Sequence, residues 1–277
     1  MLLALLLSLT AVATPSLEVV APQGVDALTS RLIEVESAIR DPELPDATVA
    51  TLGHAQQRIY RVLADDRATG DAVIAKLPPE LKTPVTKGVA AVRGHAAIVR
   101  TPRADLPAWH IEVPAPVAEL EGYYREGEAK SGVPWSLLAA VHLIETRFGR
   151  MRATSYSGAQ GPMQFMPPTW AAYGLGGDVQ DTHDAILGAA NYLAKMGAPK
   201  DVDKAIWAYN HHTGYVTAVR EVAEVIAAEP ATLRAFHGWE AYYFTPRGWL
   251  WLPVGYTATE RQPIAPFCEK WGQPYCP

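Results

Sequence analysis

The stretch GVPWSLLAAVHLIETRFGRMRATSYSGAQGPMQFMPPTW, residues 132–170, decides how the chain is organised. A proline fits the first turn of a helix because its missing N–H would have no partner there, so we expect a helix to begin near Pro134. Leu138, Val141 and Glu145 then fall at positions i, i+3 and i+7 of one helical stripe. This spacing predicts that the carboxylate of Glu145 is partly buried against the core.

Partial burial of Glu145 has a chemical consequence. Removing a carboxylate from water disfavours its charged form and raises its pKa, which suits a general acid that must hold a proton near neutral pH. The alternative is a structural ion pair with Arg147, Arg150 or Arg152, because ion pairs also perturb pKa values. The position of Glu145 on the helix does not decide between the two interpretations.

The loop SGAQGPMQFMPPTW, residues 157–170, follows the predicted helix. Gly158 and Gly161 allow a backbone to approach a ligand closely or to adopt a positive φ. Gln164 offers an amide donor and a carbonyl acceptor, which suit the hydroxyl and acetamide groups of an amino-sugar polymer. The same residues also fit an ordinary turn, followed by a short helix that begins at Pro167 and ends at Gly174.

Taken with ETRFG at residues 145–149 and AYN at residues 208–210, this loop resembles the lytic transglycosylases of the lysozyme-like superfamily, the SLT domain, in a secreted bacterial form. The resemblance covers residues 107–229, and an ordered motif of several parts is far more specific than a lone glycine pattern. Two departures from the common pattern are small: Pro162 stands where leucine is frequent, and His142 lies one helical turn before the acid.

The resemblance implies cleavage of the β-1,4 bond between N-acetylmuramic acid and N-acetylglucosamine without water, which leaves a 1,6-anhydro end. Glu145 would be the catalytic acid and would then act as the base. The tyrosine that matches Tyr209 hydrogen-bonds near the acid in this family, and Met163 would line the cleft. We expect substrate binding by Ser157, Met163, Gln164, Tyr209 and Asn210, although the matching asparagine is often structural in this family and Asn210 could equally be a helix cap.

Two other functions remain open. A goose-type lysozyme-like hydrolase of the inverting type would need a second carboxylate about 6.5–9.5 Å from the acid, and Asp178, Asp181 and Asp184 are the nearest in sequence. Capping of a helix that extends to about Met196 explains Asp181 and Asp184 more simply, and the resembling family needs no second carboxylate. A non-catalytic peptidoglycan-binding protein would keep the cleft but tolerate Glu145→Gln.

Composition and short motifs limit the classes of molecule that the protein is expected to bind. A net charge of −5 and the absence of a Lys/Arg-rich run argue against nucleic-acid binding, which depends on neutralising phosphates. His211 and His212 are adjacent and point in different directions, and His142-x-x-Glu145 is followed by Thr146 rather than by the histidine of a zinc-protease motif. We therefore expect no metal and no cofactor, and glycan strands of peptidoglycan as the partner.

Residues 1–13 are predicted to be a signal peptide. The apolar run in residues 2–7, followed by Ala-Val-Ala, is far shorter than the roughly 20 residues that span a bilayer. We expect export to the periplasm or the cell exterior without a stable membrane anchor.

The rest of the chain predicts a mainly α fold in several parts. Residues 14–100 form a small helical domain, 101–106 a linker, and 107–230 the lysozyme-like catalytic domain. Residues 231–277 form an aromatic-rich β or irregular tail, with a turn at residues 245–248 between two short strands. Cys268 and Cys276 enclose a short loop in a chain that we expect to be exported, so a disulfide is predicted.

Overall fold

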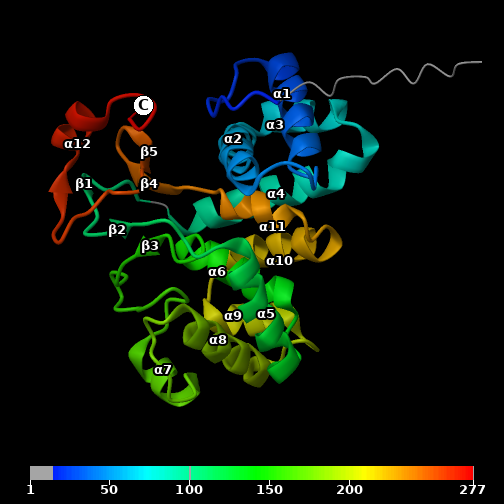
Figure 1. The fold of residues 1–277 in the computed structure, drawn as a ribbon. Coiled ribbons are helices and arrows are strands. Elements are labelled where there is room, and N and C mark those ends of the chain that lie inside the picture. The colour runs from blue at the N-terminus through cyan, green and yellow to red at the C-terminus, as the bar shows by residue number, and fades with distance from the viewer. Residues whose placement is uncertain (1–14, 100, 277) are drawn as a thin grey trace, which may run out of the picture.

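A computed structural model describes residues 15–99 and 101–276 of the chain, and Figure 1 shows its ribbon. The predicted signal peptide lies outside the described residues. The fold is mainly helical, as predicted, with three short two-stranded sheets among the described residues. Within the described ranges, no helix combines the length and the apolar character that crossing a membrane requires.

Four helices form the N-terminal part, drawn from blue to cyan in Figure 1. Helix formation follows local signals: the carboxylate of Asp66 accepts hydrogen bonds from the backbone N–H groups of Ala68 and Thr69, which caps the third helix. Pro79 occupies the first turn of the fourth helix. The bounds are α1 (Val25–Ala38), α2 (Asp46–Asp65), α3 (Arg67–Lys76) and α4 (Pro79–Ile98).

Six further helices follow in the region that the sequence assigns to catalysis, and a seventh lies just beyond it, in the predicted tail. The helix that bears Glu145 begins directly after Pro134, as predicted. The carboxylate of Asp181 caps α8 by accepting the N–H of Asp184, also as predicted. The bounds are α5 (Val117–Ser131), α6 (Trp135–Thr146), α7 (Pro167–Tyr173), α8 (Thr182–Met196), α9 (Val202–Tyr209), α10 (Thr213–Ala228) and α11 (Thr232–His237).

One hydrophobic core joins the N-terminal helices to the catalytic region. Leu63 and Val89 belong to the same buried cluster as Val141 and Val222. The backbones of α4 and α10 are in close contact at Gly94 and Gly214. A methyl group at position 94 would lie only 2.5 Å from the carbonyl oxygen of Gly214. The N-terminal helices and the catalytic region therefore share one continuous cluster of buried side chains. The division of the chain into separate domains stays a prediction.

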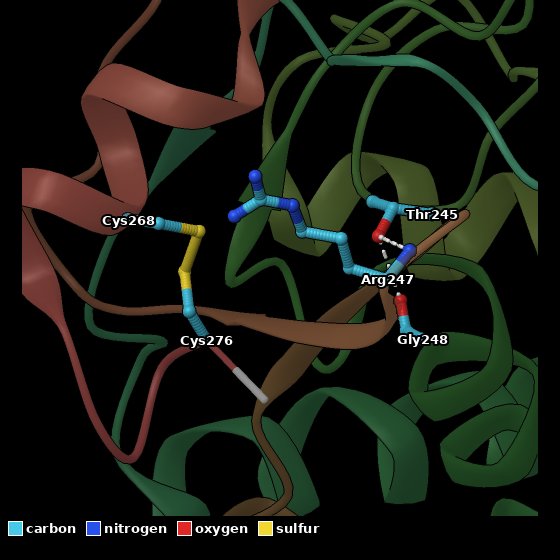
Figure 2. The surroundings of a disulfide bond; sticks show 5 residues. All are labelled: Thr245, Arg247, Gly248, Cys268 and Cys276. Atoms are coloured by element: carbon cyan, nitrogen blue, oxygen red, sulfur yellow. Dashed lines mark hydrogen bonds between the residues drawn. A yellow bond between two sulfur atoms is a disulfide. The ribbon is translucent and has the colours of Figure 1, made fainter.

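The C-terminal tail adds small sheets and a last helix. The predicted turn lies between β4 (Ala241–Thr245) and β5 (Gly248–Leu252), which form an antiparallel hairpin. Figure 2 shows how the hydroxyl of Thr245 closes this turn: it accepts the N–H of Arg247 and donates to the carbonyl of Gly248. The remaining elements are β1 (Asp105–Leu106) paired with β6 (Gln262–Pro263), β2 (His110–Ile111) paired with β3 (Met151–Arg152), and α12 (Ile264–Trp271).

The tail packs on the predicted linker through a second core. Leu106 and Ile111 from the linker side are buried in one cluster with Leu250 and Phe267 from the tail. The buried hydroxyl of Tyr256 also donates a hydrogen bond to the carbonyl of Pro107 at 2.6 Å. The tail therefore holds the segment around residues 101–111 in place.

The structure contains the disulfide between Cys268 and Cys276 that the sequence predicts (Figure 2). We expect the double variant Cys268→Ser/Cys276→Ser to lower the free energy of unfolding of the tail by about 2–3 kcal/mol, because the unfolded loop regains conformational freedom. Denaturant unfolding followed by tryptophan fluorescence measures this difference. A reducing agent should lower the stability of the wild type and leave the variant unchanged; equal midpoints for both oxidised proteins would contradict the prediction.

Candidate active site

Glu145 occupies a distinctive position in α6. Eleven of the twelve residues of this helix are buried, and Glu145 is the one that reaches the surface. Its partial burial is as the sequence predicts. The neighbours that bury the helix come mainly from α5, α8 and α10. The helix therefore presents a single carboxylate from an otherwise apolar segment.

The side chain that holds this carboxylate is Tyr215, in the first turn of α10. Its hydroxyl donates a hydrogen bond to Oε1 of Glu145 at 2.5 Å, and its ring is buried. The start of α10 is fixed by His212, whose ring nitrogen accepts the N–H of Gly214 at 3.0 Å. Burial and the nearby carboxylate raise the pKa of Tyr215 well above its ordinary value, so the hydroxyl keeps its proton and remains a donor.

Burial raises the pKa of Glu145 to about 7. The hydrogen bond from Tyr215 and the positive charge of Arg147 act in the opposite direction and lower it by less than burial raises it. A carboxyl with this pKa is partly protonated at neutral pH and ionises easily. Such a group can give up a proton and take one back, which a general acid and base requires.

The ion-pair interpretation of Glu145 is not what the structure shows. Among the described residues, no arginine lies within ion-pair distance of its carboxylate, and the three arginines after α6 bind other groups. Arg147 donates to the carbonyl of Leu143 at 2.6 Å, Arg150 pairs with Glu240 at 3.2 Å, and Arg152 pairs with Glu112. The pKa of Glu145 is therefore set mainly by burial rather than by a salt bridge.

Thr146 connects the acid-bearing helix to the glycine-rich loop. Its buried hydroxyl donates to the carbonyl of Pro162 at 2.6 Å and accepts the N–H of Gly149 at 3.0 Å. The chain turns sharply here, since Arg147 and Phe148 both have positive φ values, 55° and 62°. Such backbone is strained for residues with a side chain, so the hydroxyl of Thr146 helps to hold the turn.

The loop itself is held by internal hydrogen bonds. Gln160 and Phe165 exchange two backbone hydrogen bonds of 2.9 Å. The amide nitrogen of Gln164 donates to the carbonyls of Ala153 at 3.1 Å and Gly161 at 2.9 Å. The expectation that Gln164 offers a ligand both donor and acceptor needs correction, because both amide hydrogens stabilise the loop. Its carbonyl oxygen is the part left for a ligand.

Two further expectations for this loop are corrected. The side chain of Met163 is fully buried, so it packs in the core and does not line a cleft; burying its apolar atoms stabilises the loop. Tyr209 donates its hydroxyl to the carbonyl of Met163 at 2.7 Å, and Tyr215 rather than Tyr209 binds Glu145. The rings of the two tyrosines lie parallel, with centroids 6.3 Å apart.

A pocket of about 300 Å³ opens beside the loop. Gln164, Met166 and Tyr209 line it, and Met166 is 41% exposed. Ser157 lies exposed in the loop, and Asn210 directly follows the last residue of α9, as a helix cap would. Binding roles for Ser157 and Asn210 stay predictions.

The acidic residues before α8 have structural partners. Asp178 accepts the N–H of Gln180, Asp181 that of Asp184, and Asp184 that of Asp178, each at 2.9 Å. Of the described residues, Asp181, His183 and Asp184 bring potential metal ligands within 4.8 Å of one another. His183 also contacts a carboxylate oxygen of Glu126 at 2.9 Å, so these groups already stabilise the loop and the start of the helix.

Comparison with known proteins finds one family model that matches the region around Glu145. Residues 122–225 match the transglycosylase SLT domain family. This region, a little over a third of the chain, is therefore similar to the SLT domain that the motif resembles.

Two curated relatives carry the same name, membrane-bound lytic murein transglycosylase F. The protein from Thiobacillus denitrificans is 30% identical over 125 residues, which cover 42% of this chain and 26% of the relative. The protein from Stutzerimonas stutzeri is 28% identical over 145 residues, which cover 50% of this chain and 29% of the relative. The chain thus matches well under a third of the length of these relatives. No solved structure matches it.

Tyr215→Phe tests how the pKa of Glu145 is set. The variant keeps the buried ring and removes the hydrogen bond that favours the ionised carboxylate, so the pKa of Glu145 should rise further. If protonated Glu145 is the active form, the rate falls as pH increases through this pKa, and the falling limb should move up by about one pH unit. Tyr209→Phe is the matched control, because its hydroxyl binds Met163. If the falling limb of the pH–rate profile does not move in Tyr215→Phe, the Tyr215 hydroxyl does not set the pKa of the catalytic group.

Proposed function

We propose that the chain is a peptidoglycan lytic transglycosylase that cleaves the bond between N-acetylmuramic acid and N-acetylglucosamine without water. The observation that carries the proposal is Glu145: one half-buried carboxyl with a pKa of about 7, held by Tyr215 in the region that matches the SLT family. The carbonyl oxygen of Gln164 and the ring of Tyr209 at this pocket suit a sugar with hydroxyl and acetamide groups.

The chemistry follows from a single acid that changes its protonation state. Protonated Glu145 gives its proton to the glycosidic oxygen, and the bond from this oxygen to C1 of the muramoyl residue breaks. The carboxylate then takes the proton from the muramoyl 6-hydroxyl, and the oxygen of that hydroxyl bonds to C1. The products are a 1,6-anhydromuramoyl end and a free N-acetylglucosamine hydroxyl, and Glu145 is protonated again.

Tyr215 has a positioning role in this cycle. Its hydroxyl binds one carboxylate oxygen and leaves the other for the substrate. The hydrogen bond stabilises the ionised acid between the two proton transfers, while burial favours the protonated state before the first. We also propose that the protein acts outside the cytoplasmic membrane, where peptidoglycan lies.

The decisive experiment is mass spectrometry of the products released from purified peptidoglycan. 1,6-Anhydromuropeptides from the wild type would support the proposal. Products with reducing ends would instead indicate a hydrolase, and variants of Asp178, Asp181 and Asp184 would then identify its second carboxylate. Binding of peptidoglycan without any product would indicate a binding protein.

A further inference from the structure

A second pocket, of about 310 Å³, lies at the other end of the glycine-rich loop. Thr154 and Tyr156, just before the loop of residues 157–170, form one wall. The other walls come from Trp109 in the segment before α5 and from Tyr243 and Phe244 in β4. Most of this pocket is therefore built by parts of the chain outside residues 122–225, the region that matches the SLT family.

The walls of this pocket are fixed by contacts between distant segments. The backbone N–H of Arg103 donates to the carbonyl of Phe244 at 3.0 Å. Trp109 packs edge to face on Tyr243, with ring centroids 5.3 Å apart. Arg261 donates to the hydroxyl of Tyr243 at 3.0 Å while it also pairs with a nearby carboxylate. The pocket is thus a built feature of the fold.

The charge of the pocket points to an anionic ligand. The guanidinium of Arg261 is offset by the carboxylate of Asp105, which accepts two hydrogen bonds from it. Arg103 also lines the pocket, is exposed, and its guanidinium has no ion-pair partner among the described residues. Asp105 also interacts electrostatically with Arg103, so the two guanidinium groups and one carboxylate leave one net positive charge at the pocket, in a chain whose net charge is −5.

The aromatic walls of the pocket indicate that the ligand also has apolar groups. Trp109, Tyr243 and Phe244 offer apolar surface, and the ring of Tyr156 at the pocket is 98% exposed. Aromatic rings beside one net positive charge suit a ligand that combines apolar groups with a carboxylate. A short acidic peptide has both, whereas a neutral sugar would leave the cation unused.

We propose that this pocket binds the acidic stem peptide that peptidoglycan carries on the lactyl group of N-acetylmuramic acid. The inference rests on the proposed function, because it assigns a second contact to the same substrate. Arg103 would bind a peptide carboxylate, and the aromatic walls would contact its apolar side chains. A glycan in the pocket beside Gln164 could thus place its peptide at the other end of the loop.

The loop links the two pockets. The carbonyl of Ala153, directly before the first wall, accepts a hydrogen bond from the amide of Gln164 at 3.1 Å. The hydroxyl of Ser155 accepts the N–H of Ala159 at 2.9 Å. A peptide that contacts residues 154–156 therefore stabilises the same hydrogen-bonded loop that holds Gln164 at the glycan pocket.

The first test compares cleavage of intact peptidoglycan with cleavage of glycan strands whose peptides an amidase has removed. We expect Arg103→Gln to raise KM for peptide-bearing strands by about tenfold, the effect of one lost charge-assisted contact, with a much smaller change for peptide-free strands. Arg103→Lys should recover part of the loss. Arg67→Gln, an exposed arginine on α3, is the control for net charge. Equal effects of Arg103→Gln on both substrates, or none, would overturn the proposal.

The second test needs no catalysis. A free stem tetrapeptide is titrated by calorimetry into the wild type and into Arg103→Gln, and we expect about tenfold weaker binding to the variant. Arg103-dependent binding without any anhydro product would leave the pocket assigned and refute the transglycosylase. Anhydro products from a protein that does not bind the peptide would refute the pocket alone. Arg103-dependent binding of peptide-free glycan in place of the peptide would assign the pocket to sugar and overturn the proposal.

Discussion

Glu145→Gln is expected to lower the formation of 1,6-anhydromuropeptides by about a thousandfold. Glutamine has the same shape and can still accept the hydrogen bond of Tyr215, but it cannot give a proton to the glycosidic oxygen. General acid and base catalysis by one positioned group contributes roughly 10²–10⁴-fold, and here one group serves both steps. The measurement is the rate of anhydro product release by mass spectrometry, at equal amounts of bound peptidoglycan.

The same substitution should stabilise the folded protein at alkaline pH, which separates loss of chemistry from loss of folding. The pKa of Glu145 is raised in the folded state, so the stability it contributes is present below its unfolded value and is lost as pH rises towards 7. At pH 8 the charged carboxylate disfavours folding by on the order of 2–3 kcal/mol. Glutamine carries no charge, so Glu145→Gln should unfold at a higher denaturant concentration than wild type at pH 8 and show little difference at pH 4. Substantial activity in a stable variant would exclude Glu145 as the acid.

Gly161→Ala should be the most damaging small substitution in the loop. Gly161 has a φ of 72°, and a methyl group there would lie 1.8 Å from the carbonyl oxygen of Val179. The left-handed backbone costs a non-glycine residue roughly 1–2 kcal/mol, and overpacking adds about 1–3 kcal/mol. We expect a loss of about 2–5 kcal/mol in the free energy of unfolding, together with displacement of the loop and reduced turnover. Chemical denaturation measures the first and product release the second.

Gly158→Ala is the matched control for this substitution. Gly158 lies in the same loop with a φ of 91°, but a methyl group there would meet no atom within 4 Å. Only the cost of the left-handed backbone applies, so the free energy of unfolding of the variant should fall by about 1–2 kcal/mol. If the two variants lose the same stability, the close approach of Val179 does not determine the tolerance of position 161.

The sequence predicts the parts of this molecule that local signals control. Pro134 marks the start of α6, the carboxylate of Asp181 caps α8, and the turn at residues 245–248 closes a hairpin. The helical stripe through Val141 also places Glu145 correctly at the edge of the core. Each of these features depends on residues within a few positions of one another, so a single chain suffices to find them.

The errors concern contacts between residues far apart in the chain. Tyr209 follows the family motif, yet it is Tyr215, from the next helix, whose hydroxyl binds Glu145. The local sequence holds a signal for it: a second tyrosine in the first turn of an apolar helix just after the Tyr-Asn pair. The family resemblance places Met163 at the cleft, and only the packed fold shows that its side chain is buried. The role of Thr146 could not be predicted either, because the carbonyl that its hydroxyl binds, that of Pro162, lies sixteen residues away.

The close contact between Gly94 of α4 and Gly214 of α10 limits how this domain can be transplanted. Gly214 immediately precedes Tyr215, so the backbone that α4 supports is also the backbone that orients the phenol on the acid. Residues 122–225 moved alone into another protein would carry Glu145 and the loop but leave the outer face of α10 without its natural neighbour. A chimera intended to be active should therefore include α4, or a replacement helix with a glycine at the point of closest approach.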